Sequence, residues 1–342
     1  MDELIHVFVN DIINEATAAA VPRRRRCESR EDPFEMRDAD FIKNFRLNKN
    51  LVRNLMNMVE PFIEQKEIDL KTKVLCALNF FATGSYQTPV GNSYIINLSQ
   101  PSVSRCIKDI INALNNEVIF KQWVHFPRTH QELNAVLREF YDIYQFPGVV
   151  GCIDCTHVAI VPPPTRGYLS CDERAYVNRK NYHSINVQLI CDAKLKILNV
   201  NALFPGSTHD SYIWNNSQVL TLMEQLHRTG HQNYHLIGDS GYALRPWMLT
   251  PLSNPPEGTA EHRYNEALKT TRATVERLNG VLKARFRCLL KDRVLHYKPS
   301  TATKIINACT VLHNMCMANN LDLPEVDEGD DIMDLNIKQL HA

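Results

Sequence analysis

Three acidic residues in short, distinctive sequence frames give the strongest chemical signal in this chain. Asp154 lies in Gly-Cys-Ile-Asp-Cys-Thr-His, Asp239 in Ile-Gly-Asp-Ser-Gly-Tyr, and Glu276 in Thr-Val-Glu-Arg. Carboxylate oxygens are the ligands that hard cations such as Mg²⁺ and Mn²⁺ prefer. Three carboxylates that hold two such cations would suit the in-line cleavage of a phosphodiester bond.

The first two acids follow apolar runs that predict buried strands. Val149–Ile153 comes directly before Asp154, and Tyr234–Ile237 comes just before Asp239. Carboxylates at the ends of neighbouring central strands point into one crevice, where sites form in open α/β sheets. Two carboxylates there would repel each other, and a divalent cation would remove that repulsion. An Asp at a strand end is also a common turn or cap residue, so neither acid is decisive by itself.

Glu276 is predicted to lie on a helix from about residue 267 to residue 290. Arg272 and Lys283 stand on the same face of that helix, one turn before and two turns after Glu276. Between residues 269 and 293 there are eight Lys or Arg side chains against two acids, an excess that fits a polyanion partner. The alternative for Glu276 is a solvated glutamate on a charged helix.

The frames occur with further motifs, in an order that resembles a known family. These motifs are Pro-Gly-Ser-Thr-His-Asp-Ser at 205–211 and Val-Glu-Arg followed by Gly-Val-Leu-Lys-Ala-Arg-Phe at 275–286. Over residues 45–320 the chain resembles the PIF/Harbinger transposase family. The nearest likeness is to Harbinger transposase-derived nucleases, which occur as host genes in animals.

The resemblance implies an RNase H-like core with an Asp-Asp-Glu metal triad. It assigns Asp154, Asp239 and Glu276 as the catalytic residues and ligands of Mg²⁺ or Mn²⁺. It also implies a separate Myb-like DNA-binding protein as partner. Asp210 is a further acid in a family motif. Its residue position favours capping of the following helix, with a supporting metal role as the second interpretation.

The expected fold class is α/β, with an RNase H-like mixed sheet and a catalytic helix, preceded by an all-helical domain with a helix-turn-helix-like segment. With 342 residues and 44% hydrophobic content the chain can hold one large or two medium domains. The predicted parts are an N-terminal helix and basic linker (1–37), a helical domain (38–145), an RNase H-like DDE nuclease domain (146–320) and an acidic disordered tail (321–342).

In the helical domain, apolar spacing predicts helices at 44–62, 70–82, 90–97 and 102–114. Ser99 is expected at the N-cap of the last of these, with Pro101 just inside its start. This start is similar to that of a helix-turn-helix recognition helix, on which Arg105 and Lys108 could contact DNA. A plain helical bundle packed on the core is the alternative.

In the nuclease domain, strands are predicted at 185–191 and 197–204, followed by a helix at 211–226 and a last helix at 303–319. A basic loop at 162–181 could also touch DNA. The predicted DNA-binding residues are Arg105, Lys108, Arg179, Lys180, Arg272, Lys283 and Arg285.

Charge and composition bound the compartment and the partners. The net charge of zero conceals a tail of charge −6 after residue 320 and a body of charge +6. Arg23–Arg26 could be a nuclear localisation signal or a solvated linker, and we expect a nuclear protein, with the cytoplasm left open. No apolar run approaches the ~18 residues of a membrane span, and the N-terminus has no secretory pattern.

Cysteines and competing functions complete the expectations. Most of the ten cysteines lie in apolar patterns and are expected to be small buried hydrophobes. Cys152 and Cys155 bracket Asp154, but zinc would need a second pair at suitable spacing. The leading hypothesis is a DDE-type DNA endonuclease. The alternatives are a catalytically silent DNA-binding or adaptor protein, and a hydrolase of RNA or hybrid on the same fold. A homo-oligomer is left open.

Overall fold

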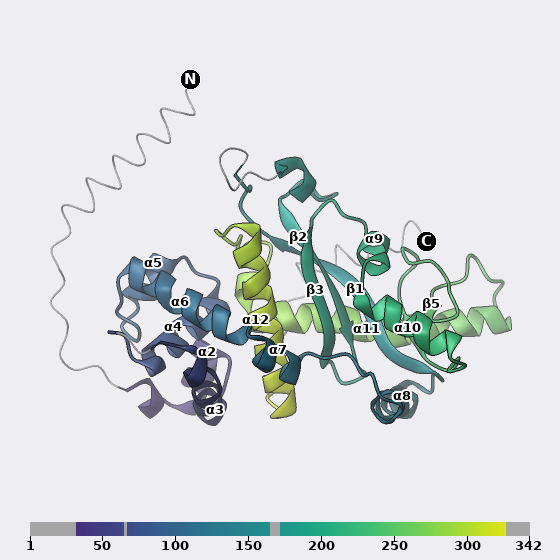
Figure 1. Cartoon of the computed structure of the whole chain (residues 1–342), viewed down its shortest axis with the longest axis horizontal. Coiled ribbons are helices and arrows are strands. Elements are labelled where there is room, and N and C mark those ends of the chain that lie inside the picture. Colours follow the sequence, from purple (N-terminus) through teal and green to yellow (C-terminus); the bar gives the residue numbers. More distant parts are fainter. Residues whose placement is uncertain (1–31, 65–66, 165–171, 326–342) are drawn as a thin grey trace, which may run out of the picture. The chain divides into compact units, whose positions relative to one another are not determined.

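The computed structural model describes residues 32–64, 67–164 and 172–325 (Figure 1). The chain divides into a short unit, Met1–Glu35, and a large unit, Met36–Ala342. The described part of the short unit holds the 3-10 turn η1 (Pro33–Glu35). The predicted helix at 2–20, the Arg23–Arg26 run and the acidic tail from residue 326 on lie outside the described residues.

The large unit begins with helices, four of which start at a side-chain cap. They are α2 (Asp38–Phe45), α3 (Lys49–Val59), α4 (Leu70–Thr83), α5 (Gln87–Asn92), α6 (Gln100–Leu114), α7 (Glu117–Trp123) and α8 (His130–Tyr144), with a 3-10 turn η2 (Glu60–Phe62) after α3. Asn48 and Asp69 accept backbone N–H groups at the starts of α3 and α4, and Thr129 forms a capping box with Glu132 at α8. The predicted helix at 44–62 is wrong at its start, because Arg46 adopts the left-handed conformation and ends α2.

Helix α6 starts where the sequence predicted and packs as part of a helical bundle. Ser99 occupies its N-cap position and Pro101 follows inside the first turn, as predicted. Its apolar face packs on α4, α5 and α12, as in a helical bundle. Arg105 and Lys108 lie on the opposite, exposed face, where they remain available to a partner.

A five-stranded mixed sheet follows the helices and confirms the predicted fold class. Its strands are β1 (Val149–Ala159), β2 (Ser184–Cys191), β3 (Ile197–Pro205), β4 (His235–Ile237) and β5 (Met248–Leu249). The order is β3-β2-β1-β4-β5. The first three strands pair antiparallel, and β4 and β5 add to the edge of β1 as parallel strands. An antiparallel meander extended by parallel strands is the RNase H-like arrangement.

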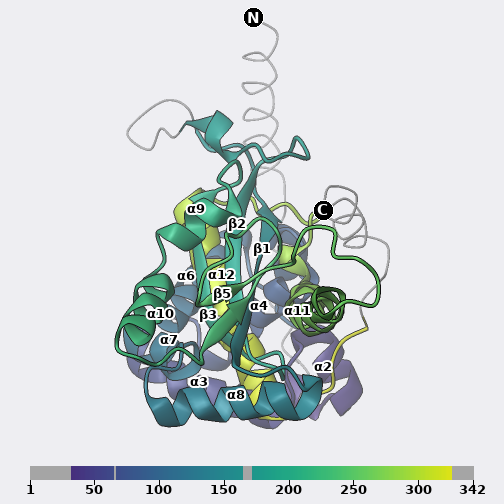
Figure 2. The ribbon, with the colours of Figure 1, turned by 90° about the vertical axis from the view of Figure 1, so that its right-hand side faces the viewer.

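Helices cover the two faces of this sheet. The remaining elements are η3 (Glu173–Tyr176), α9 (Asp210–Asn215), α10 (Gln218–Arg228), α11 (Ala260–Arg285), η4 (Arg287–Leu289) and α12 (Pro299–Ala318). Figure 2 shows α9 and α10 on one side of the sheet and α11 on the other. Strand β2 is buried along its whole length, as expected for a strand that is covered on both faces.

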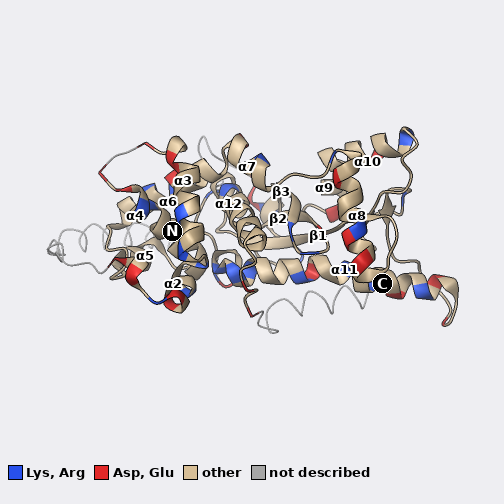
Figure 3. Ribbon diagram, turned by 90° about the horizontal axis from the view of Figure 1, so that it is seen from below, with Lys and Arg blue, Asp and Glu red and all other residues tan. Residues whose placement is uncertain are grey.

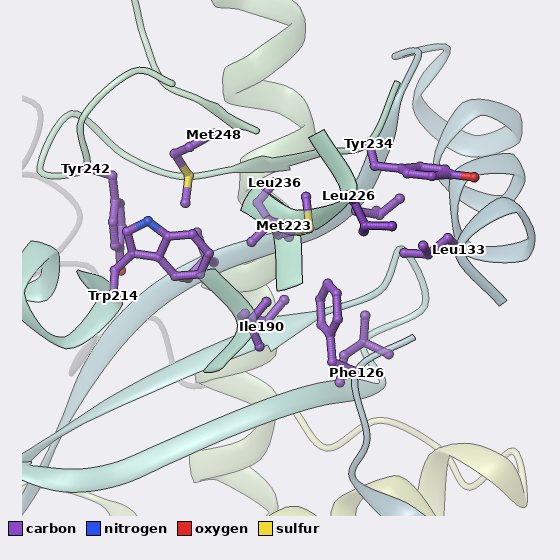
Figure 4. Packing of buried hydrophobic residues seen from close by; sticks show 14 residues of the cluster. Phe126, Leu133, Ile190, Trp214, Met223, Leu226, Tyr234, Leu236, Tyr242 and Met248 are labelled. Carbon is purple, nitrogen blue, oxygen red and sulfur yellow. The ribbon is translucent and has the colours of Figure 1, made fainter. Parts of the chain in front are cut away.

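One hydrophobic cluster joins the sheet to α9 and α10. Ile153 and Ile190 from β1 and β2 pack with Trp214 and Met223 from these helices, and Tyr242 closes one end (Figure 4). Burial of side chains of this size contributes about 1.5–3 kcal/mol each. The cluster therefore fixes which residues of β1 face α9 and α10, and leaves the alternate residues to face α11.

Several predicted boundaries need correction. The helix at 211–226 is two helices, because Ser217 caps a new start at α10. Helix α11 begins at Ala260, where Thr259 supplies the cap, and η4 follows its end at Arg285. The last helix begins at Pro299. Strand β1 continues to Ala159, so Asp154 lies within the strand.

The eight cysteines in the described residues are buried free thiols, as the sequence predicted. His313 on α12 is fully buried, and its Nε2 lies 2.8 Å from the carbonyl oxygen of Leu195, a contact that joins α12 to the β2–β3 turn. Among the described residues, no helix combines the length and the apolar character that crossing a membrane requires.

Candidate active site

Asp154 lies in the centre of the sheet and faces α11. Its neighbour two residues earlier, Cys152, contacts the carbonyl oxygen of Thr271 on α11 at 3.4 Å. Residues i and i+2 of a strand share a face, so Asp154 faces the same helix. The side chain is 5% exposed, and a carboxylate buried to this degree needs compensating partners.

Asn279 supplies one such partner. Its Nδ2 donates to Oδ2 of Asp154 at 3.1 Å, across the interface between α11 and β1. Sequence reasoning missed this residue. The available signal was its place three residues after Glu276, which sets the two side chains one turn apart on the same face of the helix.

Asp239 follows the neighbouring strand, as predicted. Strands β1 and β4 are parallel with Cys152 opposite Ile237, and Asp239 comes two residues after the end of β4, as Asp154 comes two residues after Cys152. Gly238 lies against Ile153 and Tyr242, and a Cβ there would stand 2.6 Å from the Tyr242 ring. Oδ1 of Asp239 accepts the Gly241 N–H at 3.0 Å, a turn that fixes the partly exposed carboxylate at the strand end.

Glu276 lies on the sheet-facing side of α11, one turn before Asn279. Arg272 Nη2 pairs with its Oε1 at 2.5 Å, and the two side chains are 14% and 19% exposed respectively. At this burial the pair is far better shielded from water than an ordinary surface ion pair. Arg272 therefore holds Glu276 in place next to the Asp154–Asn279 contact.

Asp210 belongs to the opposite face of the sheet. Its Oδ1 accepts Nδ2 of Asn186 at 2.9 Å, and Asn186 stands opposite His157 in the β1–β2 register, on the face that carries Ile153. The capping interpretation is wrong, because His209 occupies the N-cap position and α9 has no side-chain cap. Asp154 and Glu276 thus lie on the α11 side of the sheet, and Asp210 does not join them there.

Tyr242 packs in the hydrophobic cluster on the α9 side of the sheet. Its hydroxyl contacts Sγ of Cys155 at 3.5 Å. Burial, followed by the charges of Cys155, Asp210 and Asp154, raises the pKa of Tyr242 well above its usual value. The hydroxyl thus stays protonated, and the ring belongs to the apolar cluster that covers the α9 side of β1.

The predicted DNA-binding residues fall into two classes of exposure. Arg105, Lys108 and Arg179 are exposed and Lys180 is half-buried. Arg272 is paired with Glu276, and Lys283 and Arg285 are buried in α11. The first class can meet a large partner directly, whereas the second lies within the protein.

The donor chemistry fits a hard divalent cation. Oδ1 of Asn279 is buried and has no hydrogen-bond partner among the described residues. With the carboxylates of Asp154, Asp239 and Glu276 it makes an all-oxygen set, the kind that Mg²⁺ and Mn²⁺ prefer. The described residues hold no group of three acidic, His or Cys side chains already placed as metal ligands. Glu276 would have to leave Arg272 in order to join such a group.

The chain is similar in sequence to known proteins. Residues 153–314 match the family model described as DDE superfamily endonuclease. The chain is 37% identical over 268 residues to "Putative nuclease HARBI1" of Homo sapiens, a match that covers 78% of this chain and 73% of the relative. The Bos taurus protein of the same name is 36% identical over the same shares.

A solved structure is also similar, at a low level. The chain resembles one titled as a pre-cleavage Mos1 transpososome, with 12% identity and a TM-score of 0.21, over 77% of this chain and 81% of that one. A similarity of this size carries no argument about the site.

Proposed function

Because the chain belongs to the Harbinger transposase-derived nuclease family and carries a DDE superfamily endonuclease domain, we propose that it is a metal-dependent DNA endonuclease. One observation carries the proposal. Asp154 lies on β1, Asp239 follows the neighbouring parallel strand β4 by two residues, and Glu276 on α11 lies one turn from the Asn279 side chain that bonds Asp154. These relations support a site drawn from three distant parts of the chain, whose acids would have to come closer together to hold a cation.

The chain's own residues would prepare the reaction as follows. Asp154, Asp239 and Glu276 would hold Mg²⁺ or Mn²⁺, which when bound lowers the pKa of an attacking water and offsets the charge of the phosphate. Asn279 fixes the rotamer of Asp154 through its Nδ2. Tyr242 and the core cluster exclude water from the α9 side of β1. The new P–O bond forms to the water oxygen, and the bond to the 3′ oxygen breaks.

The proposed substrate is DNA, and the proposed compartment is the nucleus. Support comes from the exposed Arg105 and Lys108 on α6 and Arg179 in the loop before β2. A Myb-like DNA-binding protein is the proposed partner, which would deliver the enzyme to its site. Cleavage by this chain alone is therefore expected to be weaker than cleavage with that partner.

A second candidate is a DNA-binding adaptor that no longer cuts. The Arg272–Glu276 ion pair favours it, because the arginine neutralises the carboxylate charge and occupies one of the two oxygens that a cation would need. Metal binding separates the two functions, since the nuclease needs Glu276 to exchange one partner for the other.

The deciding experiment measures Mn²⁺ binding by calorimetry and cleavage of a labelled DNA duplex. Asp154→Asn and Asp239→Asn keep the side-chain shape and remove the charge, and both are expected to lose both signals. Asp142→Asn, an exposed acid on α8, is the control and should behave as wild type. Absence of Mn²⁺ binding in the wild type would reject the nuclease and favour the adaptor.

A further inference from the structure

Three arginines converge where the helical part meets the end of α11. Arg46 ends α2, Arg285 is the last residue of α11, and Arg287 opens η4. Figure 3 shows Lys and Arg gathered along the end of α11. The active site lies further back along the helix, around Glu276 and Asn279, so this cluster is a separate feature.

The Arg46 backbone and the Arg285 side chain both lie next to Cys316 of α12. Sγ of Cys316 contacts the Arg46 carbonyl oxygen at 3.9 Å. Burial raises the pKa of Cys316 against the opposing effect of Arg285, whose charge and hydrogen bond act on the thiol. The Arg285 side chain is 2% exposed, and its Nη2 donates to the Asp322 carbonyl oxygen at 3.2 Å.

The end of α4 brings Arg287 to the same place. Nη2 of Arg46 reaches the Ala82 carbonyl oxygen at 3.5 Å. Two residues on, a Cβ on Gly84 would stand 2.9 Å from the Arg287 carbonyl oxygen. Burial, and then the charges of Arg287 and Arg285, lower the pKa of Arg46. Three like charges are therefore held together, and Arg287 is exposed to solvent.

These guanidinium groups have unmet hydrogen-bond donors. Nε of Arg46 and Nε of Arg285 are both buried and have no hydrogen-bond partner among the described residues. Among the described residues, none of these three arginines forms an ion pair with an acidic side chain. A buried donor without an acceptor and clustered like charges are both costly. An oxyanion held by the exposed Arg287 and the half-buried Arg46 would offset the clustered charge, and guanidinium forks match phosphate oxygens well.

We propose that Arg46 and Arg287 form a phosphate-binding site, to which the buried Arg285 adds its charge from behind, and that the occupant is a backbone phosphate of bound DNA. The identity of the occupant rests on the proposed function. Arg277, Arg287, Lys291 and Arg293 are exposed along this stretch, so a single polyanion can contact both the neighbourhood of Glu276 and this cluster. The site would anchor the duplex at a point that belongs jointly to the helical part and the nuclease part.

The first test uses inorganic phosphate and does not depend on DNA or on metal. The melting temperature is measured against rising phosphate, with ionic strength held constant by chloride. The melting temperature of the wild type is expected to rise with phosphate, because ligand binding stabilises the folded state. Arg46→Gln/Arg287→Gln should weaken phosphate binding by about tenfold or more. If the double variant does not fold, Arg287→Gln, which changes an exposed side chain, carries the test.

The control removes two exposed arginines elsewhere, Arg138→Gln/Arg245→Gln, and should keep the wild-type response. An equal response in wild type and in the site variant, or no response in wild type, would overturn the site. The second test measures DNA affinity against salt. The site variant should reduce the slope of log affinity against log salt by about one, and the control variant by less.

The two proposals can fail separately. Loss of the phosphate response with an unchanged DNA slope would show that the occupant is not DNA. If the site variant keeps Mn²⁺ binding and cleavage at low salt, the nuclease proposal holds regardless of the result for the phosphate site. Failure of Mn²⁺ binding in wild type would remove the nuclease and leave the phosphate response to be judged by itself.

Discussion

Asn279 donates a hydrogen bond from its amide nitrogen to Oδ2 of Asp154 at 3.1 Å, and its amide oxygen is buried without a hydrogen-bond partner among the described residues. The reverse orientation of the amide would put two oxygens against each other, so the hydrogen bond fixes which end faces outward. One side chain of α11 thereby both orients Asp154 and presents an oxygen to the same place.

We predict that Asn279→Ala lowers stability by about 1–3 kcal/mol and weakens Mn²⁺ binding. A buried carboxylate loses a hydrogen-bond donor, which accounts for the first effect. Loss of one oxygen and of the fixed Asp154 rotamer accounts for the second. Urea unfolding with and without Mn²⁺ measures both quantities.

Asn265→Ala is the matched control for Asn279. Asn265 also lies on α11, and it makes two hydrogen bonds to the Leu252 backbone, at 2.9 and 2.8 Å. Its loss should lower stability to a similar degree but leave Mn²⁺ affinity unchanged. Equal Mn²⁺ affinity in Asn279→Ala and wild type would remove Asn279 from the metal site.

The sequence predicted the acids better than their partners. Apolar runs before Asp154 and Asp239 identify strands, and strands in sequence order pair in few ways, so the sheet could be anticipated. Nothing local marks Asn279 as a partner of Asp154, because the contact joins residues 125 positions apart. The i,i+4 spacing of Arg272 and Glu276 did permit an ion pair, yet the excess of basic residues favoured a DNA contact instead.

Predicted helix boundaries were wrong where a single residue ends or starts a helix within a continuous apolar pattern. Apolar spacing continues through residues 211–226, but the Ser217 hydroxyl oxygen accepts the Leu220 N–H and caps the start of a second helix. Strand β5 has two residues, too few for any alternating pattern. The burial of Lys283 and Arg285 depends on α12 and the segment after it, which pack on α11 only in the folded chain.

Arg272→Ala should lower stability and at the same time tighten Mn²⁺ binding. Removal of one partner leaves the other charge of a mostly buried pair uncompensated, at a cost of about 1–3 kcal/mol after allowance for partial exposure. The same change frees the Glu276 carboxylate from its arginine. Calorimetry with Mn²⁺ and urea unfolding in chelator give the two values.

Arg277→Ala is the control for Arg272, since Arg277 lies on the same helix with its side chain exposed. It should change neither quantity. Weaker Mn²⁺ binding in Arg272→Ala would mean that Arg272 positions Glu276 for the cation instead of competing with it.

Gly206→Ala should destabilise the turn between β3 and α9 by about 1–3 kcal/mol. A Cβ at this position would lie 2.3 Å from Oγ of Ser184 and 2.5 Å from the Tyr176 carbonyl oxygen, and the latter is backbone that cannot simply rotate away. Thermal unfolding measures the loss. Ser207→Ala, at the next position, should cost much less. A Gly206→Ala melting temperature equal to wild type would show that the turn can relax.

Asp192 makes the β2–β3 hairpin sensitive to pH. Its Oδ1 accepts the N–H groups of Lys194 and Lys196, both at 2.8 Å. Burial nevertheless raises its pKa to about 6, against the effect of these hydrogen bonds. The folded state therefore binds a proton more tightly than the unfolded state does. The contribution of Asp192 to stability is greatest below its ordinary pKa of about 4 and is lost as pH rises through about 6.

Asp192→Asn keeps the accepting oxygen and removes the titration. As the pH rises from 4 to 7, we expect the free energy of unfolding of the variant to increase relative to that of the wild type by up to about 3 kcal/mol. Urea unfolding measures this difference. Asp69→Asn should behave in the opposite way. At Asp69 hydrogen bonds from Thr72 outweigh burial and lower the pKa, so its charged form stabilises the fold above pH 4. A constant difference between Asp192→Asn and wild type across this range would mean that Asp192 has an ordinary pKa in the folded protein.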